Sequence, residues 1–113
     1  MPALLLASCL AAFSVAAAEF VPGVEDLPLM PGLEAVAEAS TSFETPTGRI
    51  VEAEARGKGM SEAEVRRFYA GTLPALGWRA VNDRRYERAG ERLTIDVTQG
   101  RGMLSVRFDI RPR

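Results

Sequence analysis

The alternation of apolar and polar residues in the last quarter of the chain constrains the fold most strongly. Within residues 91–98 and residues 103–110, aliphatic or aromatic side chains recur at every second position from Leu93 to Val97 and from Leu104 to Ile110. A period of two is typical of a β-strand with one buried and one solvated face. The sequence Gln-Gly-Arg-Gly between them favours a two-residue type II′ turn centred on Gly100 and Arg101. These residues therefore predict an antiparallel hairpin.

The predicted turn determines which residues of the hairpin face each other. It gives three apolar pairs on one face, namely Leu93 with Phe108, Ile95 with Val106 and Val97 with Leu104. On the other face it places Arg92 opposite Asp109, with opposite charges. A slip of one residue would place apolar beside polar side chains throughout, so the pattern excludes that error.

One amphipathic helix precedes this hairpin. Ser61 and Glu64 have the spacing of a capping box, in which the serine hydroxyl accepts a hydrogen bond from the Glu64 amide. Apolar residues then recur at helical spacing until a proline and a glycine end the pattern, so we predict a helix over residues 62–73. Arg66, near the middle of this helix, is expected to point to solvent.

Shorter strand patterns lie on both sides of the helix. Four further strands are predicted at residues 41–44, 49–56, 78–81 and 84–88. With the C-terminal hairpin they give the element order ββαββββ. We therefore predict an α+β fold class, in which residues 41–113 form a two-layer domain with an antiparallel sheet and the helix packed on one face.

The aromatic residues are expected to fill the space between the helix and the sheet. They are Phe43, Phe68, Tyr69, Trp78 and Phe108. The alternative is a crevice in the same place, lined by these rings, which would take a small ligand.

The segment FYAGTLPALGW, residues 68–78, follows the capped helix and leads into a strand. In this pattern, FY-x3-LP-x-LGW, the chain resembles small exported bacterial proteins of the proteobacterial type, mostly uncharacterised, in which a helix ends in Leu-Gly-Trp and strands follow. The similarity covers residues 60–82, and its motif is architectural, with aromatic side chains, a proline stop and a glycine cap. The resemblance implies a fold and an exported location, and it implies no catalytic residue.

The first eighteen residues have the composition of a secretory signal. Residues 3–15 contain no charged side chain and are followed by three alanines, so we expect cleavage between Ala18 and Glu19. The apolar run is shorter than the roughly 20 residues that span a bilayer, so no transmembrane helix is expected in the mature chain. The alternative is a lipoprotein anchored through Cys9, because Leu-Ala-Ser-Cys resembles a lipobox. We therefore expect an exported, periplasmic protein.

The residues that remain after this cleavage contain neither cysteine nor histidine. A thiolate nucleophile, an imidazole base and a Cys/His metal site are therefore excluded from the mature chain. Glu52 and Glu54 could form a carboxylate pair of the kind that glycosidases use, but alternating charges are more often a solvated strand face. We expect no catalytic residue, no bound metal and no cofactor.

Residues 19–40, which we call the N-terminal strap, are irregular and interrupted by proline. Four apolar side chains stand out in this segment, namely Leu27, Leu29, Met30 and Leu33. Leu27 and Met30 each precede a proline, which favours extended backbone over helix. One interpretation is a strap that covers the apolar sheet face left open by a short helix, and the other is a segment that contacts a partner. The first is favoured, because burying such side chains offsets the cost of ordering the segment.

Charge is unevenly distributed along the expected mature chain. Residues 19–60 carry eight acidic and three basic side chains, whereas residues 61–113 carry seven and eleven. Four arginines near the turns that follow the helix are the candidate anion-binding residues, namely Arg79, Arg84, Arg85 and Arg88. Pairing with neighbouring carboxylates is the alternative role for these side chains.

The sequence thus predicts a small non-catalytic accessory or interaction module of the bacterial envelope, which binds a protein or another envelope component. The alternative is a module that binds a small ligand in the helix–sheet crevice, or an anionic lipid on the arginine-rich hairpins. Nucleic acid is not an expected partner, because the chain is expected to be exported and has a net charge of −1.

Overall fold

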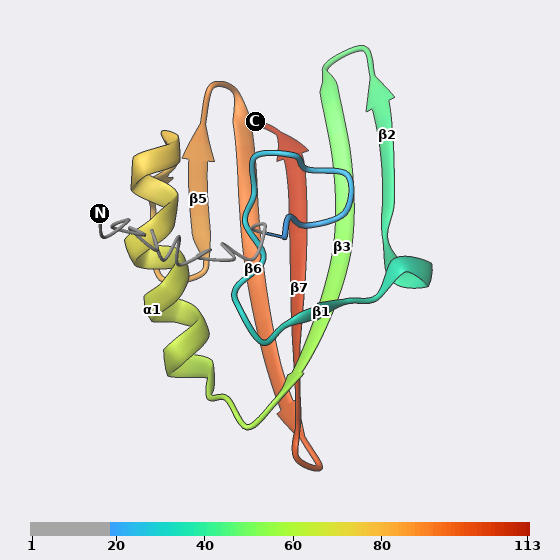
Figure 1. Ribbon diagram of the computed structural model, residues 1–113. Coiled ribbons are helices and arrows are strands. Elements are labelled where there is room, and N and C mark those ends of the chain that lie inside the picture. The colour runs from blue at the N-terminus through green and yellow to red at the C-terminus, as the bar shows by residue number, and fades with distance from the viewer. Residues whose placement is uncertain (1–18) are drawn as a thin grey trace, which may run out of the picture.

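The computed structural model describes residues 19–113 (Figure 1). The predicted signal peptide and the alternative lipid anchor at Cys9 fall on residues 1–18, outside the described residues. The elements follow in the order β1 (Glu34–Ala35), η1 (Ala37–Ala39), β2 (Thr41–Thr45), β3 (Gly48–Lys58), α1 (Glu62–Thr72), η2 (Leu73–Leu76), β4 (Arg79–Ala80), β5 (Arg85–Arg88), β6 (Glu91–Gly100) and β7 (Met103–Pro112).

The predicted α+β two-layer architecture is confirmed. The seven strands form one antiparallel sheet in the order β1-β3-β7-β6-β5-β4, and β2 also pairs with β3. The predicted order ββαββββ missed one strand, because β1 has two residues and is too short to show an alternating pattern.

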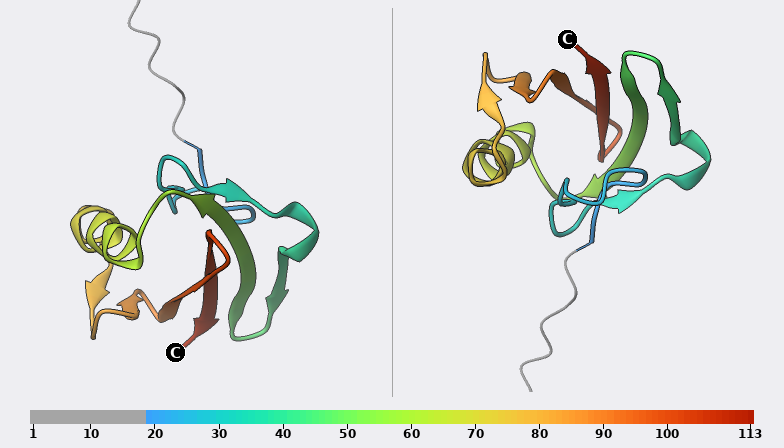
Figure 2. Two further views of the ribbon diagram at one scale, coloured as in Figure 1. Left: turned by 90° about the horizontal axis from the view of Figure 1, so that it is seen from below. Right: turned by 90° about the horizontal axis from the view of Figure 1, so that it is seen from above.

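The sheet is curved, and its two faces have different surroundings. Seen along the strands, the helix α1 and residues 19–33 of the strap lie on the concave side of the sheet (Figure 2). The convex side carries the outward-facing polar residues of the alternating strands. We call this convex side the outer face.

The edge of the sheet beside β3 is made of two separate pieces. Glu34 in β1 faces Arg56, and Thr41 in β2 faces Glu52. The chain therefore advances seven residues along the edge while β3 advances four. The three extra residues form the short 3-10 segment η1, which is closed by a hydrogen bond from the Ser40 hydroxyl to the Val36 carbonyl.

The turn of the C-terminal hairpin differs from the prediction. Gly100 pairs with Met103, so the loop consists of Arg101 and Gly102, with φ values of 54° and 76°. Positive φ at both central residues is the signature of a type I′ turn, in place of the predicted type II′ turn.

The predicted pairs within this hairpin are therefore wrong by two residues. The observed pairs are Leu93 with Ile110, Ile95 with Phe108, Val97 with Val106 and Arg92 with Arg111. Because side chains alternate with a period of two, this shift leaves every side chain on its predicted face. The apolar pattern excludes a one-residue slip, but it cannot distinguish two registers of the same parity.

The helix begins as predicted. The Ser61 hydroxyl accepts a hydrogen bond of 3.1 Å from the Glu64 amide. The α-helix ends at Thr72, the 3-10 segment η2 continues it to Leu76, and Gly77 follows with φ 90°. A left-handed glycine at this position turns the chain into β4, because other residues rarely adopt that conformation.

The core lies between α1, the strap and the concave face of the sheet. Tyr69 of the helix contacts Phe108 of β7 edge to face, with ring centroids 5.4 Å apart. Tyr69, Trp78 and Phe108 are buried as expected, and Phe68 is partly buried. Phe43 is the exception, since it is 53% exposed on the outer face.

Candidate functional site

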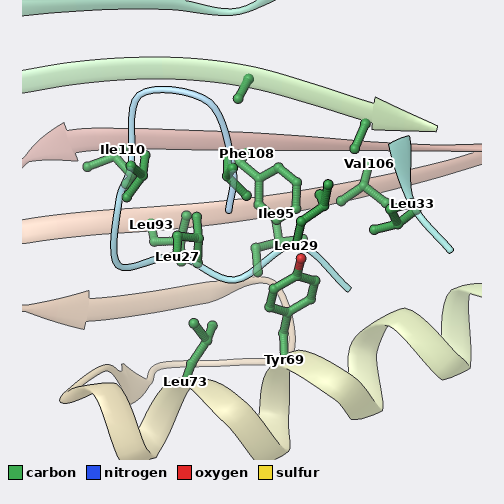
Figure 3. Packing of buried hydrophobic residues seen from close by; sticks show 14 of the residues in the cluster. Leu27, Leu29, Leu33, Tyr69, Leu73, Leu93, Ile95, Val106, Phe108 and Ile110 are labelled. Atoms are coloured by element: carbon green, nitrogen blue, oxygen red, sulfur yellow. The ribbon is translucent and has the colours of Figure 1, made fainter. Parts of the chain in front are cut away.

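The apolar residues of the N-terminal strap pack against the sheet and the helix. Leu27, Leu29 and Leu33 are buried in the same cluster as the core residues of α1 and of the sheet, and Met30 packs partly buried against it. Figure 3 shows Leu27 and Leu29 between the side chains of α1 and those of β6 and β7. In this conformation the side chains of Leu27, Leu29 and Leu33 are not accessible to a partner, and the strap occupies the space where a helix–sheet crevice was considered.

Tyr69 holds the strap through its hydroxyl group. The hydroxyl donates a hydrogen bond of 3.0 Å to the Pro28 carbonyl and accepts one of 3.2 Å from the Met30 amide. Burial raises the pKa of Tyr69 well above its ordinary value, and the hydrogen bond from Met30 opposes this only in part. The hydroxyl therefore stays neutral and acts as donor and acceptor at once.

Arg88, one of the four candidate anion-binding arginines, also holds the strap. Its guanidinium lies 2.7 Å from the Asp26 carboxylate and 4.3 Å from the centre of the Trp78 ring, and it donates to the Leu76 carbonyl. The side chain is only 19% exposed. Arg88 thus lies on the concave side, as does the buried Tyr86 two residues earlier, and it is not part of a surface site.

The other three candidates lie on the outer face. Arg79 faces Glu87, and Arg85 faces Thr94, in the ladders of β4, β5 and β6. The guanidinium of Arg84 binds the carboxylate of Asp96, which points outward from β6. These three arginines therefore share one surface, separated from Arg88 by the thickness of the sheet.

Five further arginines, which were not among the four candidate anion-binding residues, join them. They are Arg56, Arg92, Arg107, Arg111 and Arg113. Arg85 is exposed, and the other seven side chains are between 45% and 76% exposed. We call these eight residues and the surface between them the arginine face. Writing out the outward positions of each predicted strand would have found it, because those positions are where the arginines recur.

The carboxylates of the same surface lie deeper than the guanidinium groups. They are Glu52, Glu54, Glu87, Asp96 and Asp109, and their side chains are between 13% and 44% exposed. Glu87, the most buried of them, lies 3.4 to 3.8 Å from three guanidinium groups. Glu52 is shared by two arginines, at 2.9 and 3.6 Å. The positive groups therefore form the outermost layer of this surface.

Glu52 and Glu54, the two residues considered as a carboxylate pair, both have arginine partners. Glu52 is bound by Arg107 and Arg111, and Glu54 is bound by Arg56, on an open sheet face. The hydrogen bonds that Arg111 donates to Asp109 and Glu52 raise the pKa of Arg111, and those that Arg84 donates to Asp96 raise the pKa of Arg84. Both guanidinium groups therefore remain charged throughout the physiological range.

The arginine face has a local excess of positive charge. Eight arginines stand against five carboxylates, an excess of three. Glu34 and Lys58 at the end of the sheet add one charge of each sign and leave this excess unchanged. The rest of the chain holds the remaining five bases and nine acids, an excess of four negative charges. Positive charge is therefore concentrated on the outer face, and the rest of the chain is negative on balance.

Within residues 19–113, no three side chains of the types His, Cys, Asp and Glu are arranged to hold a metal ion. The same part of the chain contains no helix that is long and apolar enough to cross a membrane. Comparisons with protein-family models, with curated proteins and with solved structures find no match to this chain.

Proposed function

We propose that this protein is a non-catalytic binding module of the bacterial envelope, and that it recognises an anionic envelope component through the arginine face. The observation that carries this proposal is the layering of charge, in which eight exposed guanidinium groups cover five less exposed carboxylates. Export, expected from the first eighteen residues, would bring this surface to the envelope.

The internal ion pairs of this surface leave it able to bind an external anion. Ion pairs between exposed side chains contribute little to stability, about 0–1 kcal/mol each, because water screens them. Several arginines share a carboxylate, as Arg79, Arg92 and Arg113 share Glu87, so their charge is only partly neutralised. Guanidinium groups bind phosphate and carboxylate oxygens in a bidentate manner, which makes anions with these groups the chemical class that fits.

The packing of the strap makes it the less suitable of the two possible interaction surfaces, the strap and the outer face. Because Leu27 and Leu29 are buried against the core, contact with a partner through the strap would require the strap to leave the sheet. The arginine face needs no such rearrangement, since its side chains already extend into solvent. The outer face is therefore the better candidate for an interaction surface.

The proposal is tested with two double variants that change the net charge equally. Arg85→Glu with Arg107→Glu alters the arginine face, and Arg67→Glu with Arg101→Glu alters exposed arginines elsewhere. The probe is an inorganic polyphosphate chain at low salt, with affinity measured by isothermal titration calorimetry. We expect the first pair to weaken binding about tenfold or more, because like-charge contacts replace attractive ones, and the second pair to change it about twofold or less.

Two results would count against this proposal. One is equal weakening by the two double variants, since binding would then follow net charge and not the arginine face. The other is an affinity that does not fall with added salt, because contacts with exposed charges are screened.

A further inference from the structure

One edge of the outer face exposes an aromatic side chain. Phe43 is 53% exposed, and it faces Ile50, which is itself only partly buried, across the β2–β3 ladder. Both side chains point outward, in the same direction as Glu52 two residues after Ile50. The sheet thus presents an apolar pair where a solvated strand face would have polar residues.

This apolar pair borders the arginine face. Arg111 donates a hydrogen bond of 2.9 Å to Glu52, the next outward residue of β3 after Ile50. Glu52 also faces Thr41, the outward residue next to Phe43 on β2. Phe43 and Ile50 therefore adjoin the outermost layer of guanidinium groups, and one extended partner surface could contact both at the same time.

The arginine face and the adjoining apolar pair together favour an anionic bilayer over a free polyanion in water. A free polyanion in water gains from the arginines but has no apolar layer to receive a phenyl ring. A bilayer surface has phosphates at the headgroups and acyl chains directly beneath them, and aromatic rings prefer that boundary. An anionic leaflet also attracts basic residues within a Debye length.

The width of the arginine face and the distribution of charge over the molecule also favour a bilayer as the partner. The arginines are distributed from Arg56 on β3 to Arg79 on β4, near the two ends of the sheet order, so a single small anion cannot reach them all. The charged residues outside the outer face are predominantly acidic, with nine acids and five bases. A negatively charged surface would therefore orient the molecule with its outer face inward and the strap and helix outward.

We infer that the arginine face docks on the headgroups of an anionic phospholipid bilayer, with Phe43 entering the boundary between headgroups and acyl chains. This inference rests on the proposed function and specifies its ligand class. Docking is peripheral: the guanidinium groups bind lipid phosphates, and Phe43 adds an apolar contact that no soluble phosphate offers.

The chain offers a matched pair of exposed phenylalanines for the test. Phe43 is 53% exposed on the outer face, and Phe20 is 49% exposed in the strap. The probes are vesicles of phosphatidylglycerol and phosphatidylcholine in equal parts, and vesicles of phosphatidylcholine alone, with binding measured by co-sedimentation. All variants carry the same N-terminus, so any membrane affinity of residues 1–18 is common to all of them.

Phe43→Ala is expected to lower the partition into the anionic vesicles about tenfold, because a largely buried phenyl ring contributes at least that much. Phe20→Ala is expected to leave it unchanged, and phosphatidylcholine alone is expected to bind poorly. Affinity for inorganic polyphosphate should be the same for Phe43→Ala and the parent protein. As a second readout, Phe43→Trp should show a blue-shifted, lipid-quenched emission component on anionic vesicles, and Phe20→Trp should not.

The outcomes separate this inference from the proposed function. If the arginine double variant weakens binding to polyphosphate but Phe43→Ala leaves vesicle binding unchanged, the proposed function stands and lipid docking is overturned. If Phe43→Ala weakens polyphosphate binding as much as vesicle binding, the ring is merely structural and the inference is also overturned. If the arginine double variant changes neither, both proposals fail.

Discussion

Replacing Leu27 by alanine tests whether the N-terminal strap belongs to the folded unit. Leu27 is fully buried, and its side chain lies between Leu73 of the helical segment and Leu93 and Ile110 of the sheet (Figure 3). Truncation of a buried leucine costs about 2–5 kcal/mol, because it removes apolar contacts and leaves a cavity. We take about 3 kcal/mol as the expected loss in the free energy of unfolding.

That loss is large for a chain of this size. About 95 ordered residues correspond to a total stability of about 5–14 kcal/mol. A loss of about 3 kcal/mol would lower the unfolding temperature by about 12–24 °C. Urea titration with tryptophan fluorescence measures it directly, since Trp78 is the only tryptophan of the chain and is buried.

The matched control is the same substitution at Leu76, which is 37% exposed. Leu76→Ala should cost less than about 1 kcal/mol, because little apolar area is lost. If Leu27→Ala costs no more than Leu76→Ala, the strap is not part of the cooperative unit. If the unfolding free energy of Leu27→Ala depends less steeply on urea concentration than that of the parent protein, the variant folds with its strap detached and exposes less new surface on unfolding.

Three further substitutions test the polar contacts of the fold, with urea titration as the measurement. Tyr69→Phe should cost about 1–3 kcal/mol at neutral pH, because the Pro28 carbonyl and the Met30 amide, both partly buried, lose their partner. The loss of stability in Tyr69→Phe should become smaller at alkaline pH. Folding raises the pKa of Tyr69, so the hydroxyl contributes its full stabilisation below the ordinary tyrosine pKa of about 10 and contributes less as the pH rises above that value. Arg88→Met should cost about 1–2 kcal/mol, through loss of the Asp26 and aromatic contacts, whereas Arg67→Met should be neutral. Ser61→Ala should cost about 1 kcal/mol through the lost helix cap, and Ser61→Gly only a few tenths; equal costs would argue against the cap.

The periodicity of the sequence predicted which side of the sheet most residues occupy, but not their neighbours. In the C-terminal hairpin, Leu93 lies on its predicted face and yet opposes Ile110 and not Phe108. The position of the turn sets the register of the hairpin. Both Gly100-Arg101 and Arg101-Gly102 contain a glycine that can adopt positive φ, so the sequence does not show which pair forms the loop. A pattern with a period of two carries no information that separates registers differing by two residues.

The sequence also failed to predict which face of the fold some of the arginines occupy. Counting arginines near the turns found Arg79, Arg84 and Arg85 but also included Arg88, which shares its strand face with the buried Tyr86. Arg66 was expected to point to solvent, yet its guanidinium donates to the Ile95 carbonyl at 2.6 Å and the side chain is 16% exposed. Long cationic side chains can lie along apolar surfaces and reach backbone carbonyls, so a helical position does not determine their exposure.

The expectation for Phe43 failed for a related reason. Its strand has only five residues, Thr41–Thr45, and no other large apolar side chain, so nothing in the sequence indicated which face Phe43 occupies. The pairing with β3 decides it, because Phe43 faces Ile50 on the polar side of that strand.

The break between β1 and β2 has a consequence for the behaviour of the protein at high concentration. An open sheet edge is a template on which strands of other molecules can add, and long flat edges lead to aggregation. Here the segment η1 divides one edge into pieces of two and five residues, and the opposite edge, β4, has two. Molecules gathered on a crowded surface would therefore meet without a continuous row of free amides and carbonyls through which to polymerise.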